Sequence, residues 1–170
     1  MMLRALRVLP LALALGAGPA AVPAQQSVSL DPLFHASEGW LNGGLSRAAL
    51  AGKVVIVDVF TFGCYNCKNV LPNLRALYHP NSSDVAIVGI HTPETPYERE
   101  RANVVANLKV EGVVWPVAID NSHALWDAFN IEYWPTQLIF DRKGHLRKTV
   151  VGDSQDAEVN ATVKELVAEK

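Results

Sequence analysis

Sulfur is scarce in this 170-residue sequence, which contains two cysteines and two methionines. The methionines, Met1 and Met2, open the chain, and the cysteines, Cys64 and Cys67, stand three positions apart. A disulfide between them would be a poor structural crosslink, because closing so short a loop removes almost no chain entropy. We therefore interpret the pair as a site of chemistry.

Basic segments, internal repeats and low-complexity segments are also missing. Lys and Arg number 15 against 17 Asp and Glu, and no basic run indicates a nucleic-acid partner. Five histidines are scattered without the spacing of metal ligands, so we expect neither a metal nor another cofactor. Haem attachment would need histidine directly after Cys67, where Lys68 stands. The composition, 49% hydrophobic and 19% charged, indicates one ordinary globular domain with an N-terminal extension.

The N-terminus has the pattern of a secretory signal peptide. Arg4 and Arg7 precede an apolar run over residues 8–15, too short to span a bilayer, and small residues then lead to Ala24. We expect cleavage after Ala24 and a soluble protein in the periplasm or outside the cell; the alternative is an uncleaved anchor helix. The predicted division is a signal peptide over residues 1–24, a flexible leader over 25–40 and one domain over 41–170.

The cysteine pair follows an apolar segment, residues 54–60, that predicts a buried parallel strand. Apolar residues at helical spacing after the pair predict a helix that packs on the sheet. A helix N-terminus carries unpaired N–H groups and the positive end of the helix dipole, and both favour a thiolate. Because the thiolate is the nucleophile in disulfide exchange, Cys64 is the expected attacking residue and Cys67 the resolving one.

Asp58 interrupts the predicted strand. An isolated buried carboxylate is very costly, so this group must be paired, hydrated or protonated. A carboxyl group beneath a dithiol can move protons during exchange, which makes Asp58 a candidate site residue.

Strands alternate with helices along the rest of the domain, which predicts an α/β fold with a mixed sheet. Further strands are expected over residues 85–90, 113–119, 136–140 and 146–151, the last two as an antiparallel hairpin. A capping box, Thr95-Pro96-Tyr97-Glu98, begins a helix. We interpret the charge run over residues 98–101 as a solvated face, and His91, at a strand end, as a hydrogen-bonded structural histidine.

These motifs resemble those of thioredoxins. The order and spacing of six residues match the thioredoxin active-site segment: Asp58, Phe60, Cys64, Cys67, Lys68 and Pro72. Trp134-Pro135-Thr136 resembles the segment that carries the family's cis-proline, opposite the dithiol. The stretch over residues 89–94 is similar to the TlpA/ResA branch, and the C-x-N-C and H-T-P-E motifs most resemble the periplasmic thioredoxin-like domains associated with DipZ. The resemblance covers residues 41–152.

The resemblance implies a thioredoxin-like three-layer domain, with a central mixed β-sheet flanked by helices. It implies an exported thiol–disulfide oxidoreductase that acts on protein disulfides as a reductant. The implied electron donor is a membrane protein of the CcdA/DsbD type, and we expect a monomer. The candidate catalytic residues are Cys64, Cys67, Asp58 and Pro135, and the candidate substrate-binding residues are Trp134 and Glu94.

Departures from the family leave the redox direction open. Most thioredoxins have Trp before the first cysteine and Gly-Pro between the two, where this chain has Gly63 and Tyr65-Asn66. A copper-delivery protein on the same fold, using the same cysteines, is an alternative, and a non-enzymatic partner-binding module is another. Cu(I) is favoured by Cys and Met ligands, and both methionines would leave with the signal peptide, which disfavours copper delivery.

Overall fold

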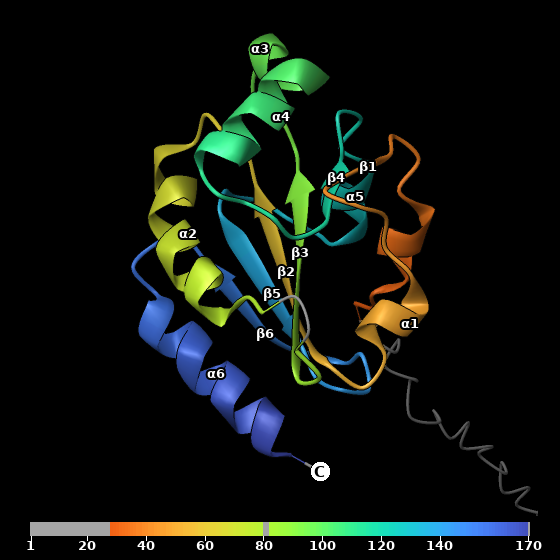
Figure 1. The fold of residues 1–170 in the computed structure, drawn as a ribbon, viewed down its shortest axis with the longest axis vertical. Coiled ribbons are helices and arrows are strands. Elements are labelled where there is room, and N and C mark those ends of the chain that lie inside the picture. The colour runs from red at the N-terminus through yellow and green to blue at the C-terminus, as the bar shows by residue number, and fades with distance from the viewer. Residues whose placement is uncertain (1–27, 80–81, 170) are drawn as a thin grey trace, which may run out of the picture.

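The computed structural model describes residues 28–79 and 82–169 (Figure 1). The described strands form one sheet in the order β1-β4-β3-β2-β5-β6. The strands are β1 (Trp40–Leu41), β2 (Val54–Phe60), β3 (Val85–His91), β4 (Val117–Ile119), β5 (Thr136–Phe140) and β6 (Leu146–Val151). The helices are the 3-10 helix η1 (Asp31–His35), α1 (Arg47–Leu50), α2 (Tyr65–Leu77), α3 (Pro96–Arg99), α4 (Arg101–Val110), α5 (Ala124–Ala128) and α6 (Asp156–Ala168). The predicted mixed sheet with flanking helices is confirmed.

Strand β2 lies near the middle of the sheet because its side chains are suited to burial on both faces. All seven of its residues are buried. It pairs in parallel with β3 and antiparallel with β5. The bounds of β2, β5 and β6 agree with the predicted ones. Strand β4 is shorter than the predicted 113–119 because Pro116 has no N–H for a ladder, and the carbonyl groups of Val113 and Trp115 accept bonds from the Asn42 side chain instead.

Two apolar clusters cover the two faces of the sheet. Figure 1 shows α2 and α6 on one face and α1 and α5 on the other. Since side chains alternate along a strand, Ile56 and Phe60 face the α2 and α6 cluster, whereas Val57 and Val59 face the other. Asp58 has the parity of Ile56 and Phe60, so it lies on the face that α2 covers.

The described part of the predicted flexible leader, residues 28–40, contains regular structure. Residues Asp31–His35 form η1, and Leu33 is fully buried in the cluster on the α1 and α5 face. Burial of this apolar side chain ties the segment to the domain. The predicted signal peptide, residues 1–24, lies outside the described residues. Within the described part of the chain, no helix is both long and apolar enough to cross a membrane.

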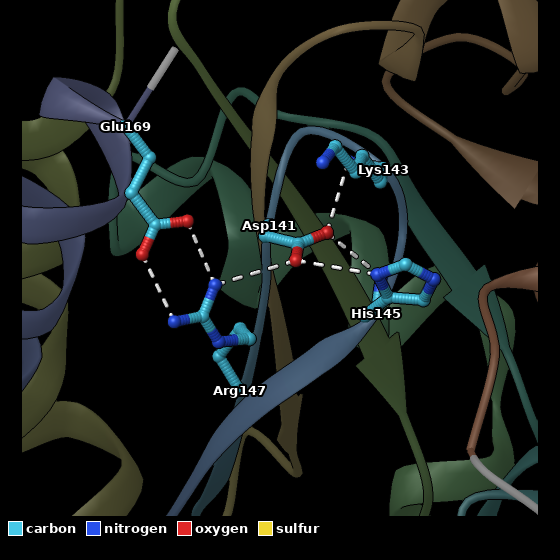
Figure 2. Close-up of polar contacts among 5 residues, drawn as sticks. All are labelled: Asp141, Lys143, His145, Arg147 and Glu169. Atoms are coloured by element: carbon cyan, nitrogen blue, oxygen red, sulfur yellow. Dashed lines mark hydrogen bonds and ion pairs between the residues drawn. The ribbon is translucent and has the colours of Figure 1, made fainter.

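Polar contacts close the hairpin between β5 and β6 (Figure 2). Asp141 Oδ1 accepts hydrogen bonds from the backbone N–H groups of Lys143 and His145, each at 2.9 Å. Arg147, on β6, lies 3.4 Å from Asp141 Oδ2 and makes two bonds, of 2.8 and 2.9 Å, to the carboxylate of Glu169. These contacts join the hairpin to the residue that follows α6.

Candidate active site

The cysteines lie where β2 passes into α2. Cys64 is the N-cap residue of α2, and its Sγ accepts a hydrogen bond from the N–H of Cys67 at 3.2 Å. The two residues are joined by a disulfide, with their Cα atoms 5.3 Å apart. Cys64 is half-buried, whereas Cys67 is only 2% exposed. The more accessible cysteine is therefore the one that sequence reasoning assigns to attack.

The Trp134–Pro135 bond is cis, as the sequence predicts. In the sheet, Thr136 stands opposite Val59, so Pro135 lies beside the carboxyl end of β2, from which the chain leads to the dithiol. The dithiol and the cis-proline are thus brought to the same edge of the sheet.

Trp134 is half-buried, as expected of an aromatic side chain at the rim of a site. Its Nε1 donates a hydrogen bond to the carbonyl group of Thr92 at 3.0 Å, and its ring lies against Trp126 with centroids 4.1 Å apart. These contacts hold the indole in place beside Pro135. Glu94, the other predicted substrate-binding residue, is exposed on the loop that follows β3.

Asp58 is fully buried, and neither of its carboxyl oxygens has a hydrogen-bond partner. Burial raises the pKa of Asp58 to about 7. Gln137, which stands opposite on β5, opposes this shift in part, although no hydrogen bond of ordinary geometry joins the two side chains. Asp58 can therefore gain and lose a proton near neutral pH, on the face of the sheet that α2 covers.

Glu98 corrects one interpretation of the sequence. The charge run over residues 98–101 was expected to form a solvated face, but Glu98 is only 4% exposed. The predicted capping box explains the burial, because the Glu98 carboxyl group reaches back to the N–H groups of Glu94 and Thr95. The capping box is the feature of the sequence that indicates a buried position for Glu98.

His91 is fully buried at the end of β3 and stacks on Phe62, with ring centroids 5.5 Å apart. Its Nε2 lies 3.4 Å from both Thr61 Oγ1 and the backbone nitrogen of Phe62, while Nδ1 has no partner. Burial lowers the pKa of His91 to about 4, with the charge of Glu98 opposing the shift. A neutral imidazole therefore supports the loop that leads to Cys64.

Comparison with known proteins agrees with this geometry. The profile of a thioredoxin-like family matches residues 52–146, over half of the chain. The chain belongs to this thioredoxin-like family.

Two relatives and one solved structure show more specifically which thioredoxin-like proteins the chain resembles. The chain is 29% identical over 147 residues to protein DipZ of Mycobacterium bovis, a match that covers 84% of this chain and 21% of DipZ. It is 27% identical to the thiol-disulfide oxidoreductase YkuV of Bacillus subtilis, across 81% of this chain and 94% of YkuV. A solved thioredoxin-like protein in the oxidised form superposes with a TM-score of 0.74 at 25% identity, covering 88% of this chain and 99% of the other. The predicted resemblance to the DipZ-like branch is confirmed, and the chain spans about a fifth of the length of DipZ.

Proposed function

We propose that this chain is a thiol–disulfide oxidoreductase that exchanges disulfides with protein partners through Cys64 and Cys67. The observation that carries the proposal is the position of the pair. Cys64 is the N-cap residue of α2, where the helix N-terminus favours a thiolate, and it is more accessible than Cys67. The similarity to YkuV, named a thiol-disulfide oxidoreductase, supports the same activity.

In the proposed reaction, the Cys64 thiolate attacks one sulfur of a partner disulfide. A mixed disulfide forms, and the other partner sulfur leaves as a thiolate that takes up a proton. Cys67 then loses its proton and attacks Cys64 Sγ, which releases the second partner thiol and leaves the Cys64–Cys67 disulfide. Two electrons pass from the dithiol to the partner disulfide.

Asp58 accepts the proton of Cys67 in this scheme. The support is its burial on the face that α2 covers, together with a pKa of about 7, at which a carboxyl group exchanges protons readily in neutral solution. Pro135, Trp134 and Glu94 would bind the partner. The backbone beside Pro135 pairs with an extended partner segment, Trp134 packs on it, and Glu94 contacts it from the loop after β3.

We further propose that the chain works as an exported reductant. The resemblance to DipZ supports this direction, and the sequence pattern of residues 1–24 supports export through a signal peptide that is then cleaved. The domain would act as a soluble monomer outside the cytoplasm, and a membrane dithiol protein of the CcdA/DsbD type would return it to the reduced form.

Trapping of partners tests the proposal. A Cys67→Ala variant cannot resolve the mixed disulfide, so it should accumulate covalent complexes through Cys64 that reducing agent releases. The matched control, Cys64→Ala, keeps one thiol but lacks the attacking one and should trap little. Trapping by Cys64→Ala and not by Cys67→Ala would reverse the roles of the two cysteines, and trapping by neither variant would reject the function. Tight stoichiometric Cu(I) binding with negligible exchange would favour copper delivery instead.

A further inference from the structure

Glu98 is a second buried carboxyl group at the edge of the sheet where the dithiol and Pro135 lie. The proposed exchange reaction does not use it. Oε2 of Glu98 accepts hydrogen bonds from the backbone N–H groups of Glu94 and Thr95, each at 2.8 Å. These two bonds fix the orientation of the carboxyl group. The surroundings of the other oxygen, Oε1, then show which residues the carboxyl group can affect.

Oε1 of Glu98 lies against Gly63, the residue before Cys64. A Cβ built on Gly63 would overlap Oε1 and would lie 3.0 Å from Cδ. Gly63 does not have a positive φ, so its backbone conformation does not itself require glycine. The carboxyl group therefore accounts for the glycine at this position, because it occupies the space that a side chain would fill.

Little positive charge offsets Glu98 in the described surroundings of Cys64. Burial keeps His91, which stacks on Phe62 in the same loop, with a pKa of about 4, so its ring is neutral at pH 7. Two further carboxyl groups belong to this part of the fold: that of Asp58, buried in β2, and that of Glu94, on the exposed loop after β3. The cationic side chains of α2 and of the charge run have other partners: Lys68 forms an ion pair with Glu111 at 3.6 Å, Arg99 donates to the Asn121 carbonyl group, and Arg101 donates to the Trp40 carbonyl group.

We propose that Glu98 is a positioning residue that holds a negative charge against the Gly63–Cys64 turn and thereby disfavours the Cys64 thiolate. This inference rests on the proposed oxidoreductase function and adds a determinant of its reducing strength. A dithiol whose thiolate is poorly stabilised gives up its electrons more readily, so the charge makes the couple more reducing. It opposes the effect of the α2 N-terminus, which acts in the other direction.

Removal of the charge alone tests the proposal. Glu98→Gln keeps a carbonyl oxygen that can accept the two backbone bonds. In a Cys67→Ala background Cys64 is the remaining thiol, so the pH dependence of its alkylation by iodoacetamide reports the pKa of Cys64. We expect Glu98→Gln to lower that pKa and to speed alkylation at pH 6 about ten-fold. An unchanged alkylation profile would overturn the proposal.

Glu100→Gln is the matched control, since it removes the same charge from an exposed side chain two residues further along. It should leave the alkylation profile close to that of the parent. In the protein with both cysteines, Glu98→Gln should also increase the dithiol fraction at equilibrium in a glutathione buffer at pH 8. A fraction that stays the same, or falls, contradicts the assigned direction.

Gly63→Ala provides a second test that does not depend on changing Glu98. The new Cβ must displace the carboxyl group, so alkylation should again become faster, and the variant should be less stable to urea. In a Glu98→Ala background this loss of stability should disappear; an equal loss in both backgrounds would show that Glu98 is not the reason for the glycine. Neither assay needs a partner protein. A Cys67→Ala variant that traps nothing therefore rejects the proposed function and still leaves the Glu98 measurement valid.

Discussion

Asp58 and Asp141 are both buried aspartates, one within the central sheet and one directly after its strand β5, but their surroundings are opposite. Asp58 lies in β2, and neither of its oxygens has a hydrogen-bond partner. Asp141 follows β5 at the other end of the sheet, is 8% exposed, and accepts hydrogen bonds from two backbone N–H groups with Arg147 nearby (Figure 2). Burial raises the pKa of Asp58 to about 7. Burial also raises that of Asp141, but the hydrogen bonds from His145, Lys143 and Arg147 outweigh it and hold the pKa below its ordinary value.

The comparison shows that hydrogen-bond donors, rather than burial alone, decide the charge of a carboxyl group inside this domain. At the hairpin, donors keep Asp141 ionised, so it can hold the turn and Arg147 together. Beneath α2, the lack of donors leaves Asp58 able to change its protonation near pH 7. The first arrangement suits a structural group, and the second suits a group that transfers protons.

The largest expected effect is on the pH dependence of stability. A group whose pKa is raised on folding contributes stability at low pH that is lost as pH rises through the folded value. For Asp58, a rise from 3.8 to about 7 corresponds to a total loss of about 4 kcal/mol, most of it between pH 4 and pH 7. Asp58→Asn should lack this loss, so its free energy of unfolding should rise relative to that of the wild type by about that amount as the pH rises. Urea unfolding of the oxidised protein at several pH values, without reductant, measures the difference.

Asp141→Asn is the control for that measurement, and the expected change of its stability difference with pH has the opposite sign. The pKa of Asp141 is lowered on folding, so the stability that it contributes is present above its ordinary pKa and is lost as pH falls. The stability difference between Asp141→Asn and the wild type should therefore shrink toward low pH. If the stability difference from the wild type changed with pH in the same direction for both variants, the surroundings of the two aspartates would not differ as described.

A smaller effect is expected when Asp141 is removed altogether. Asp141→Ala leaves the N–H groups of Lys143 and His145 without their acceptor, and should reduce the free energy of unfolding at pH 7 by about 2–3 kcal/mol. The exchange rate of the folded protein should not change, since the hairpin lies at the end of the sheet away from the dithiol. Urea titration measures the first quantity, and reduction of a model disulfide measures the second. A slower exchange by fully folded Asp141→Ala would contradict this separation of the two ends.

Much of the fold could be predicted because its main elements are specified locally. The continuous apolar runs of β2 and β5 and the capping box before α3 are properties of a few neighbouring residues. The 3-10 helix η1 and strand β1 could not be found in this way. They depend on distant partners: Leu33 is buried against the sheet, and Trp40 pairs with Ala118.

The candidate site also has parts that the local sequence specifies and parts that depend on distant partners. Cys64, Cys67 and Asp58 lie within one short segment, so their order in the sequence is enough to place them, and the Trp134-Pro135-Thr136 motif places the cis bond. The contact between Glu98 and Gly63 joins residues 35 positions apart and depends on how the loop after β3 folds over the dithiol turn. Composition alone favours a solvated position for a glutamate in a charge run, so it does not predict the burial of Glu98.

The smallest effect that separates the two aspartates concerns the rate of exchange. If Asp58 accepts the proton of Cys67, the rate of disulfide exchange should change with pH around the pKa of Asp58, about 7, and Asp58→Asn should remove that inflection. We expect the variant to be about ten-fold slower at pH 7, less than many general bases contribute, because thiols also lose protons to water in this pH range. Asp141→Asn, which keeps an oxygen for the two backbone bonds, should retain both the rate and the inflection. Stopped-flow measurement of exchange from pH 5 to pH 9 compares the three proteins, and an inflection that persists in Asp58→Asn would remove Asp58 from the mechanism.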